Sequence, residues 1–431
     1  MKKKISYLAL SADILHEGHF NIIKTANRHG RVIVGLLTDK AILEYKNLPY
    51  LNFEQRMKKI KSIKFVSEVV PQNSFDHTEN LIKIKPDYVV HGDDWKKGPL
   101  KKVRSNVIKV IKKWNGKLLE PKYTKKYSVD TFEKELHETG NSPDIRRERF
   151  KRLIDSKKIV RVLESHSPLT GLIIENLKVK NKNSFLEFDG MWSSSLTDST
   201  LRGKPDNQSV DYSTRTLGLG EILDVTTKPI VFDGDNGGRL EHLPYLIKTL
   251  DRLGVSAIVL EDKIGLKKNS LFSNQKDSRQ DTISNFSKKI EKANNVKISK
   301  DFQVVARIES LIFNRGINDA VKRAEAYSEA GANLILIHSK NKNPKEIFEF
   351  AKRFKKSKHF KPMIAVPSTY SSTREDLLIK AGIKVVIYAN HLLRASYPAM
   401  VNVAKKILLN KRSKEIENKI ISIKEILHLI K

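Results

Sequence analysis

Short apolar runs alternate with amphipathic helical patterns along the first third of the chain. The apolar runs are Ile5–Leu10, Val32–Leu37 and Tyr88–His91, and the helical patterns are Gly18–Arg28 and Phe53–Ser62. This alternation is typical of parallel strands joined by helices. We therefore predict a small doubly wound, Rossmann-like α/β domain over residues 1–135.

Turn-forming residues separate this domain from the rest of the chain. The stretch Glu138–Asp144 contains a glycine, an asparagine, a serine and a proline, and a charged helical pattern follows at Ile145–Ser156. Clusters of these residue types mark loops. We predict a linker over residues 136–146.

Eight further apolar runs follow, each ending in polar or charged residues. They are Ile159–His166, Phe185–Ser194, Pro229–Asp235, Ala257–Lys263, Gln303–Glu309, Asn333–Ser339, Pro362–Ser368 and Lys384–His391. Amphipathic patterns such as Ile317–Ala330 and Pro344–Phe354 lie between most of them. Eight strand–helix units predict a (β/α)8 barrel over residues 147–431, with an active site at the C-terminal ends of the strands.

The end of the chain carries one more apolar pattern. Residues Lys414–Lys431 place isoleucines and a leucine on one helical face: Ile416, Ile420, Ile423, Leu427 and Ile430. We expect this face to pack against a barrel or against a neighbouring subunit.

The composition narrows the class of protein. The chain of 431 residues has no cysteine, which excludes disulfides, cysteine-based zinc sites and thiol catalysis and favours the reducing cytoplasm. No apolar run approaches the ~20 residues needed to span a bilayer. The apolar core near the N-terminus is too short for a signal peptide. We expect a cytoplasmic protein without a membrane partner.

The formal charge of +32 raises the hypothesis of nucleic-acid binding. However, the lysines are scattered over the whole length, and only 7% of residues are aromatic, too few for stacking platforms. We therefore expect no nucleic-acid partner and interpret the charge as an attraction for small phosphorylated substrates.

Carboxylates at predicted strand ends suggest a metal site. Asp233, Asp235 and Glu261 follow neighbouring strands and can surround one hard cation through oxygen. Mg2+ that keeps its waters suits a few carboxylates together with a phosphate-bearing substrate. The alternative is that Asp233–Gly238 is only a turn.

Two cationic or polar groups at other strand ends suggest substrate binding. Arg307 is suited to bind a carboxylate or phosphate through two parallel hydrogen bonds, although a structural ion pair with Glu309 is the alternative. His338 ends the apolar run Leu334–Ile337, where it either serves the site or is a buried core histidine.

The segment Glu261–Ser270 runs from the end of an apolar strand into a polar loop and ends in four polar residues, Lys267–Ser270. It supplies Glu261 and then Lys263, Lys267 and Asn269 within eight positions. Such a loop can provide a metal-directed carboxylate and groups that hold an anion.

The N-terminal domain has a motif of its own. His16 and His19 follow the first strand and open the first helix, where a phosphate chain would bind. Helix capping and packing are the alternative role. A second polar segment, His91–Trp95, follows the strand that ends near residue 90.

Seven polar motifs follow one another along the barrel region: Gly190–Thr197, Lys204–Asp206, Asp233–Asp235, Glu261–Ser270, Val305–Arg307, Ile337–Lys340 and Ala389–His391. Together they resemble the phosphoenolpyruvate mutases of the isocitrate lyase superfamily. The resemblance covers about residues 147–431 and implies a barrel of that type. It also implies that the enzyme interconverts phosphoenolpyruvate and 3-phosphonopyruvate with Mg2+.

The resemblance assigns roles to individual residues. The pyruvyl end of the substrate would be lined by Trp192, Ser194, Ser195 and Leu196. The main Mg2+ contact would be Asp233, with metal-bound waters held by Asp206, Asp235 and Glu261. The phosphoryl group and substrate would be held by Arg307 and His338. The catalytic groups of a gating loop would be Lys267, Asn269 and Ser270.

Two other reactions on the same barrel have to be weighed. The related lyases use a catalytic thiol in the equivalent loop, so the absence of cysteine argues against them. A phosphonopyruvate hydrolase remains the alternative. Only Asn269 argues against it, because its neutral amide could accompany the migrating phosphoryl group and shield it from water.

Residues 5–135 resemble cytidylyltransferases of the glycerol-3-phosphate and phosphoethanolamine type. The resemblance implies that His16 and His19 stabilise the α-phosphate of CTP, bound with Mg2+. It implies nucleotide or acceptor contacts for Lys46, Asp94, Ser128 and Thr131. Leu10 stands where that family usually has glycine, so a degenerate domain is the alternative.

The fusion of the two domains suggests a bifunctional enzyme of phosphonate biosynthesis. The N-terminal domain would transfer CMP to a phosphonate such as 2-aminoethyl- or 2-hydroxyethylphosphonate. The resemblance further implies a homodimer or homotetramer.

Overall fold

The computed structural model describes residues 4–98, 100–122, 142–181, 184–265, 267–272, 275 and 278–429. The chain divides into two compact units. Unit 1 comprises Met1–Val160 and Leu177–Glu187, and unit 2 comprises Arg161–Asn176 and Phe188–Lys431. In the parts of the chain that the structure describes, every helix is too short or too polar to cross a membrane.

Unit 1 contains a five-stranded parallel sheet with the order β3-β2-β1-β4-β5. Its strands are β1 (Ile5–Leu10), β2 (Arg31–Leu37), β3 (Glu68–Gln72), β4 (Tyr88–Val90) and β5 (Lys117–Leu119). Side chains of β1 alternate between two cores, because Tyr7 packs with Trp95 on one face and Leu8 packs with Ile23 on the other. The strand order reverses between β1 and β4, which confirms the doubly wound fold.

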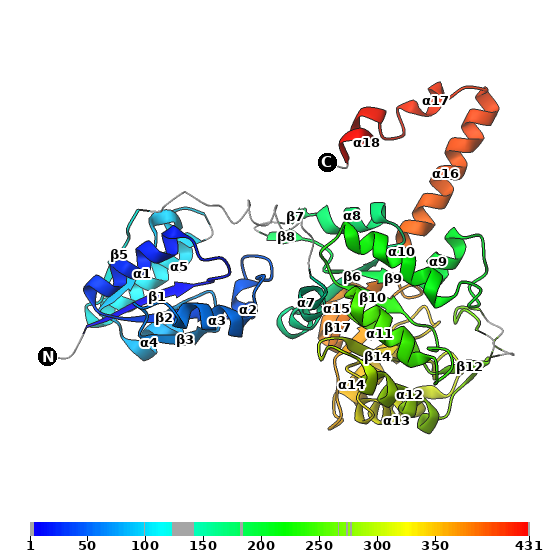
Figure 1. The fold of residues 1–431 in the computed structure, drawn as a ribbon, viewed down its shortest axis with the longest axis horizontal. Helices are drawn as coiled ribbons and strands as arrows, with labels where there is room; N and C mark the ends of the chain where they lie inside the picture. Colours follow the sequence, from blue (N-terminus) through cyan, green and yellow to red (C-terminus); the bar gives the residue numbers. More distant parts are fainter. Residues whose placement is uncertain are drawn as a thin grey trace. The chain divides into compact units, whose positions relative to one another are not determined.

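Helices cover both faces of this sheet (Figure 1). The helices of this part of the unit are α1 (Glu17–His29), α2 (Asp39–Ile42), α3 (Phe53–Lys61), α4 (Thr78–Ile84) and α5 (Leu100–Ile111), with the 3-10 turns η1 (Asp93–Lys96) and η2 (Lys112–Trp114). A further helix, α7 (Pro143–Ser156), follows them in the chain and does not lie on the sheet. Arg152 of α7 donates to the Asp39 carboxylate at 2.7 Å and to the Pro49 carbonyl at 2.8 Å. These bonds attach α7 to the rest of unit 1.

Unit 2 contains a closed barrel of eight parallel strands. They are β6 (Val160–Glu164), β9 (Gly190–Ser193), β10 (Ile230–Asp233), β11 (Ala257–Glu261), β14 (Gln303–Ile308), β15 (Leu334–Ile337), β16 (Met363–Ala365) and β17 (Ile383–Tyr388). Each strand pairs with the next one along the chain, and β17 closes the barrel on β6. The predicted (β/α)8 barrel is confirmed.

Helices surround the barrel (Figure 1). They are α8 (Pro168–Asn176), α9 (Ser195–Leu201), α10 (Tyr212–Asp224), α11 (Leu243–Leu253), α12 (Ile283–Val296), α13 (Gly316–Glu329), α14 (Lys345–Phe354) and α15 (Glu375–Ala381). The helix α16 (His391–Asn410) extends away from the barrel (Figure 1), and the chain ends with α17 (Lys414–Glu417) and α18 (Ile423–Leu429). Two antiparallel hairpins interrupt this pattern, β7 (Val179–Asn181) with β8 (Ser184–Leu186), and β12 (Lys263–Gly265) with β13 (Ser278–Gln280).

Two expectations about individual elements were wrong. The run Phe185–Ser194 is not one strand, because its first residues pair in the hairpin as β8 and the barrel strand β9 begins only at Gly190. The tail is not one amphipathic helix. It divides into α17 and α18, and Ser422 accepts from the Glu425 amide at the start of the second helix. As a result Ile416 is buried whereas Leu427 is 71% exposed.

Candidate active site

The C-terminal ends of the barrel strands bring the predicted polar residues together. Trp192 lies in β9, Asp233 ends β10, Glu261 ends β11 and Arg307 lies near the end of β14. His338 directly follows β15, and all five side chains are largely buried. The strand ends therefore form one buried polar cluster, as barrel geometry requires.

The turn after β10 places two of the carboxylates. Gly234 donates its N–H to the Val259 carbonyl at 2.9 Å, and a Cβ at this position would lie 2.9 Å from that same oxygen. Only glycine allows the backbone to come this close to β11. Asp235 follows in the left-handed region with φ +48°. The Asp233–Asp235 segment is thus a tight turn, and its two carboxylates are both buried in the site.

The loop residue Lys267 contacts these carboxylates. Its Nζ lies 2.5 Å from Asp235 Oδ1, bonds to the Asp206 carboxylate, and donates to Ser195 Oγ at 2.7 Å. Ser195 Oγ in turn donates to Asp233 Oδ2 at 3.0 Å. Three residues from separate segments thereby contact one ammonium group, and Asp233 joins them through Ser195.

Burial and crowding shift the pKa values of the acidic groups. Burial, with smaller opposing effects of Arg307 and Lys263, raises the pKa of Glu261 to about 7. Burial and the neighbouring Asp233 also raise the pKa of Asp235. Burial would raise the pKa of Asp233 as well, but Lys267 and Arg307 reverse the direction and lower it. The cluster carries more negative charge than a buried site tolerates without cations.

The residues fit Mg2+ that keeps part of its water shell. Among the described residues no three acidic or histidine side chains converge as a ready set of direct ligands. Mg2+ does not need such a set, since it is often bound through one or two carboxylates, waters and substrate oxygens. The ammonium of Lys267 between Asp206 and Asp235 shows that this cluster accepts a cation. Direct contact by Asp233, with the other carboxylates on bound waters, stays a prediction.

Arg307 contacts several groups at once. Its Nε donates to Glu309 Oε1 at 2.6 Å, and its Nη2 donates to Ser270 Oγ at 3.1 Å. The same Nη2 lies 2.9 Å from His338 Nδ1 and 3.4 Å from Glu261 Oε2. Arg307 therefore forms the pair with Glu309 and also reaches the site, so the two roles considered for it are compatible.

His338 is neutral in this environment. Burial and the adjacent guanidinium of Arg307 lower the pKa of its imidazole. Glu309, which is fully buried, lies 3.1 Å from His338 Nδ1. Nδ1 therefore lies within hydrogen-bond distance of both the Arg307 donor and the Glu309 carboxylate. These two contacts hold the ring of His338 in place at the end of β15.

The loop after β12 bonds to the site through its described residues. Asn269 Nδ2 donates to Asp206 Oδ2 at 3.0 Å, and Ser270 Oγ donates to Glu309 Oε2 at 2.6 Å. The buried Lys263 holds the backbone of the same loop, because its Nζ donates to the Lys268 carbonyl at 2.7 Å. The predicted loop residues thus contact the predicted carboxylates directly.

The residues expected at the pyruvyl end lie beside the carboxylates. Trp192 is 3% exposed, and its buried Nε1 has no hydrogen-bond partner among the described residues. Ser194 caps α9 by accepting from the Thr197 amide at 3.4 Å, so its hydroxyl has a structural role. Ser195 bonds to Asp233, and Leu196 is half-buried at the start of α9. Contacts of these four residues with pyruvate stay a prediction.

Arg215 of α10 is a site residue that the sequence did not indicate. It is 2% exposed, donates to Asp198 Oδ2 at 2.8 Å, and donates to the Asp233 carbonyl at 2.6 Å. Its guanidinium also lies 4.1 Å from the centre of the Phe232 ring. An arginine in a helical pattern with polar neighbours is expected to be solvent-exposed. No feature of the nearby sequence therefore indicated that Arg215 is buried in the site.

Asp262, the residue after Glu261, is a second functional residue that the sequence did not indicate. Asp262 is fully buried and accepts from Tyr327 Oη at 2.8 Å, Arg323 Nη1 at 3.1 Å and the Glu309 amide at 2.9 Å. Burial raises the pKa of Asp262 to about 7. These bonds fix the backbone of Glu309, which in turn contacts Arg307 and His338.

In unit 1 the two motif histidines lie together at the start of α1. The backbone N–H of His16 donates to His19 Nδ1 at 3.3 Å, and the ring centres are 3.9 Å apart. Burial, His16 and Lys46 lower the pKa of His19 to about 3, and burial and Lys46 lower that of His16. The two rings therefore cap the helix and also face the positive charge of Lys46.

The other predicted nucleotide contacts are only partly described. Asp94 lies in η1 after β4, with its Oδ1 3.7 Å from His91 Nδ1. The ring of His91 stacks on Trp95, with 3.9 Å between ring centres. Ser128 and Thr131 lie outside the described residues.

The fold and these clusters define a two-unit α/β protein, a Rossmann-like unit joined to a (β/α)8 barrel with a buried acidic and cationic site. Residues 150–408 match the family described as phosphoenolpyruvate phosphomutase, and residues 11–162 match the cytidylyltransferase-like family. The chain belongs to the phosphoenolpyruvate phosphomutase family and carries a cytidylyltransferase-like domain at its N-terminus.

Individual relatives agree with this assignment. A phosphoenolpyruvate phosphomutase of Tetrahymena pyriformis is 37% identical over 284 residues, 65% of this chain and 89% of the relative. A phosphonopyruvate hydrolase of Variovorax is 33% identical over 280 residues, 64% of this chain and 91% of the relative. The crystal structure of a phosphoenolpyruvate phosphomutase from Streptomyces platensis aligns with a TM-score of 0.60 at 31% identity, covering 65% of this chain and 93% of that structure.

Proposed function

We propose that the barrel interconverts phosphoenolpyruvate and 3-phosphonopyruvate with Mg2+, and that the N-terminal unit transfers CMP from CTP to a phosphonate. The observation that carries the first part is the contact of the loop with the acidic cluster. Asn269 bonds to Asp206, Lys267 bonds to Asp235, and Ser270 bonds to Arg307. These contacts support a site that encloses the group being transferred.

The reaction rearranges one molecule. The bond between phosphorus and the enol oxygen breaks, and a bond between phosphorus and C3 of the resulting enolate forms. Such a loose phosphoryl transfer depends on positioning and on charge stabilisation. Mg2+, when bound, would supply positive charge to the enolate oxygens. The residues that would hold it are Asp233, Asp235, Glu261 and Asp206.

The side chains have separable tasks in this reaction. Arg307 and His338 would bind the phosphoryl oxygens in transit. Glu309 and Asp262 would keep these two side chains in place. Asn269, with its neutral amide, would cover the phosphorus on the side open to the loop and exclude water.

Phosphorus NMR distinguishes this activity from hydrolysis. The purified protein is incubated with phosphonopyruvate and Mg2+, and we expect the phosphoenolpyruvate signal to grow. Free phosphate as the main product would instead identify a phosphonopyruvate hydrolase. This second function has a specific basis, because the relative from Variovorax has that name and is 33% identical.

Replacement of Asn269 tests the role of the loop in excluding water. In Asn269→Ala we expect the mutase rate to fall about 10–100-fold, since one positioned donor is lost. We also expect the share of phosphonopyruvate converted to free phosphate to rise. The control is Asn176→Ala at the exposed end of α8. An unchanged product ratio in Asn269→Ala would contradict the proposed role.

Replacement of His19 tests the N-terminal unit. In His19→Ala we expect CMP transfer, measured as pyrophosphate release from CTP and a phosphonate, to fall about 10²–10³-fold, because a donor to the α-phosphate is removed. The mutase rate of the same sample is the internal control and should not change. Failure of the unmodified protein to bind CTP would identify a degenerate domain.

A homodimer or homotetramer is the proposed assembly. None of the described residues of α16 is buried, and Tyr397, Leu408 and Leu409 are 67%, 78% and 71% exposed. Large exposed apolar side chains on one helix favour contact with another subunit. Light scattering should give at least twice the mass of one chain, and Leu408→Glu together with Leu409→Glu should shift the protein toward monomer. A monomeric unmodified protein would contradict this.

A further inference from the structure

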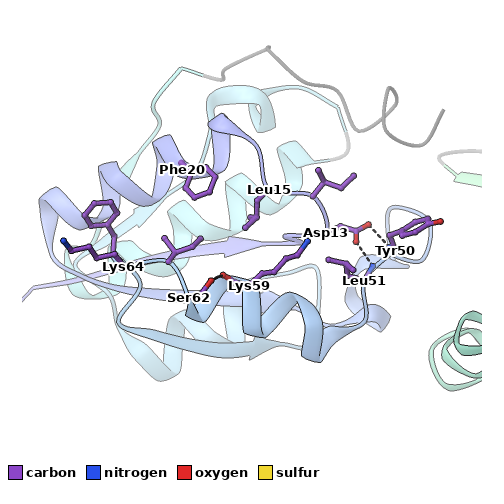
Figure 2. A pocket seen from close by; sticks show the side chains of 11 residues that line it. Asp13, Leu15, Phe20, Tyr50, Leu51, Lys59, Ser62 and Lys64 are labelled. Carbon is purple, nitrogen blue, oxygen red and sulfur yellow. Dashed lines mark hydrogen bonds between the residues drawn. The ribbon is translucent and has the colours of Figure 1, made fainter. Parts of the chain in front are cut away.

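A cavity of about 730 Å³ lies in unit 1, between α1 and α3. Its wall begins at the loop Asp13–Leu15, directly before His16, and continues along Phe20 of α1 to the segment Ser62–Phe65 after α3. Figure 2 shows Leu15 and Phe20 on one side of this space and Lys59 and Ser62 on the other. The volume is in the range of small-molecule sites.

The wall of this cavity is mainly apolar. The apolar lining residues are Ile14, Leu15, Phe20, Tyr50, Leu51, Ile63 and Phe65. Phe20 and Phe65 are 38% and 37% exposed, so both present large apolar surfaces to solvent. Covering these surfaces with the hydrocarbon part of a ligand would be favourable.

The charged groups of the lining favour an anion. The cations are Lys59 and Lys64, and no acidic side chain of the described residues is paired with either. Lys59 extends its amine toward the Asp13 end of the cavity (Figure 2). Asp13 is the single acidic lining residue, and its two oxygens accept the amides of Tyr50 at 2.7 Å and Leu51 at 2.8 Å.

We propose that this cavity binds an anion with an apolar tail, of the alkylphosphonate class, as the acceptor of the CMP transfer. The anionic end lies by Lys59 and the loop that leads to His16, and the tail lies between Phe20 and Phe65. A small acceptor with an ammonium group, such as 2-aminoethylphosphonate, meets two lysines here, and the single carboxylate, Asp13, already accepts two backbone amides. The inference rests on the proposed transferase function for the fate of the ligand, but not for its binding.

The transfer itself balances without another reactant. A phosphonate oxygen of the ligand attacks the α-phosphorus of CTP, a new P–O–P bond forms, and pyrophosphate leaves. His16 and His19 would hold the α-phosphate at the start of α1.

Calorimetric titration of the full chain with alkylphosphonates, without CTP, tests the binding. From ethyl to octyl we expect affinity to rise about two- to fourfold per methylene, because each buried methylene contributes a transfer free energy of that order. Ethylphosphonate should bind at least as tightly as 2-aminoethylphosphonate, which has almost the same shape. A flat series, or a clear preference for the amine, would overturn the proposal.

Variants locate the tail and the anionic end. Phe20→Asp and Phe65→Asp change residues that are more than one third exposed, so folding should be maintained, and both should flatten the chain-length series. Lys59→Met should weaken every member by a similar factor and leave the slope unchanged. Ile82→Asp, at a 49% exposed position of α4, is the matched control and should have no effect. Unchanged slopes in both Phe variants would place the ligand elsewhere and overturn the assignment.

Addition of CTP separates this inference from the transferase proposal. If octylphosphonate binds with the expected slope and pyrophosphate is released, both hold. If it binds but no pyrophosphate appears, the cavity is a ligand site and its assignment as the acceptor site is wrong. If a small phosphonate is a substrate while the chain-length series is flat, the transferase function holds and the cavity proposal fails.

Discussion

Arg307→Lys is expected to lower kcat/KM of the mutase reaction by about 10²–10³-fold, the loss found when one preorganised donor to a transition-state charge is removed. Lysine keeps the positive charge but not the planar fork of donors. It can replace either the bond to Glu309 or the contacts with Ser270 and His338, but not all of them. The measurement is the phosphoenolpyruvate-forming rate over a range of phosphonopyruvate concentrations.

The matched control for this change is Arg353→Lys. Arg353 also pairs with a glutamate, Glu349, at 2.6 Å, but both side chains are well exposed on α14. Its replacement should leave kcat/KM unchanged. If Arg307→Lys keeps more than one tenth of the original kcat/KM, the fork geometry of Arg307 is not needed for the reaction.

Among the variants considered for the barrel, Arg215→Met is expected to lower the free energy of unfolding most. Removal of the guanidinium leaves the Asp198 carboxylate, 12% exposed, and the Asp233 carbonyl without this donor. Breaking a buried ion pair from one side costs about 3–5 kcal/mol. For a barrel of this size, that loss corresponds to a fall in the midpoint of thermal unfolding of roughly 6–20 °C. Calorimetry of the barrel transition measures it.

Two further variants decide whether the buried charge is the cause. Arg215→Met combined with Asp198→Leu removes both partners and should recover part of the lost midpoint, since no carboxylate is left without its donor. Arg353→Met on the surface should not shift the midpoint. Equal losses in the single and double variants would show that packing of the Arg215 side chain, and not its charge, supports the barrel.

The sequence predicted the barrel because its signal repeats. Each of the eight apolar runs was short and ended in polar residues, and β10 (Ile230–Asp233) and β11 (Ala257–Glu261) have the bounds such runs lead one to expect. The prediction of a single strand over Phe185–Ser194 was wrong for a local reason. Phe185 follows the alternation of a strand, but it pairs in an antiparallel hairpin outside the barrel, and composition does not distinguish these two partners.

The site was predictable where residues lie at the ends of strands. Asp233, Glu261 and Arg307 were found because parallel strands bring their C-terminal ends to the same side of the barrel. Arg215 and Asp262 were not predicted, because the position of a strand end does not determine their contacts. Arg215 reaches the site from a helix, and Asp262 points to Tyr327 and Arg323 of another helix, so their partners are distant in sequence.

The ammonium of Lys267 among the carboxylates has a consequence for how the protein endures changes in metal supply. Because Lys267 already balances part of the charge of Asp206 and Asp235, the barrel carries its own counter-ion. If the proposed reaction needs Mg2+, removal of the metal should stop that reaction without unfolding the barrel. The proposed activity should then return when Mg2+ is added back to the same molecules.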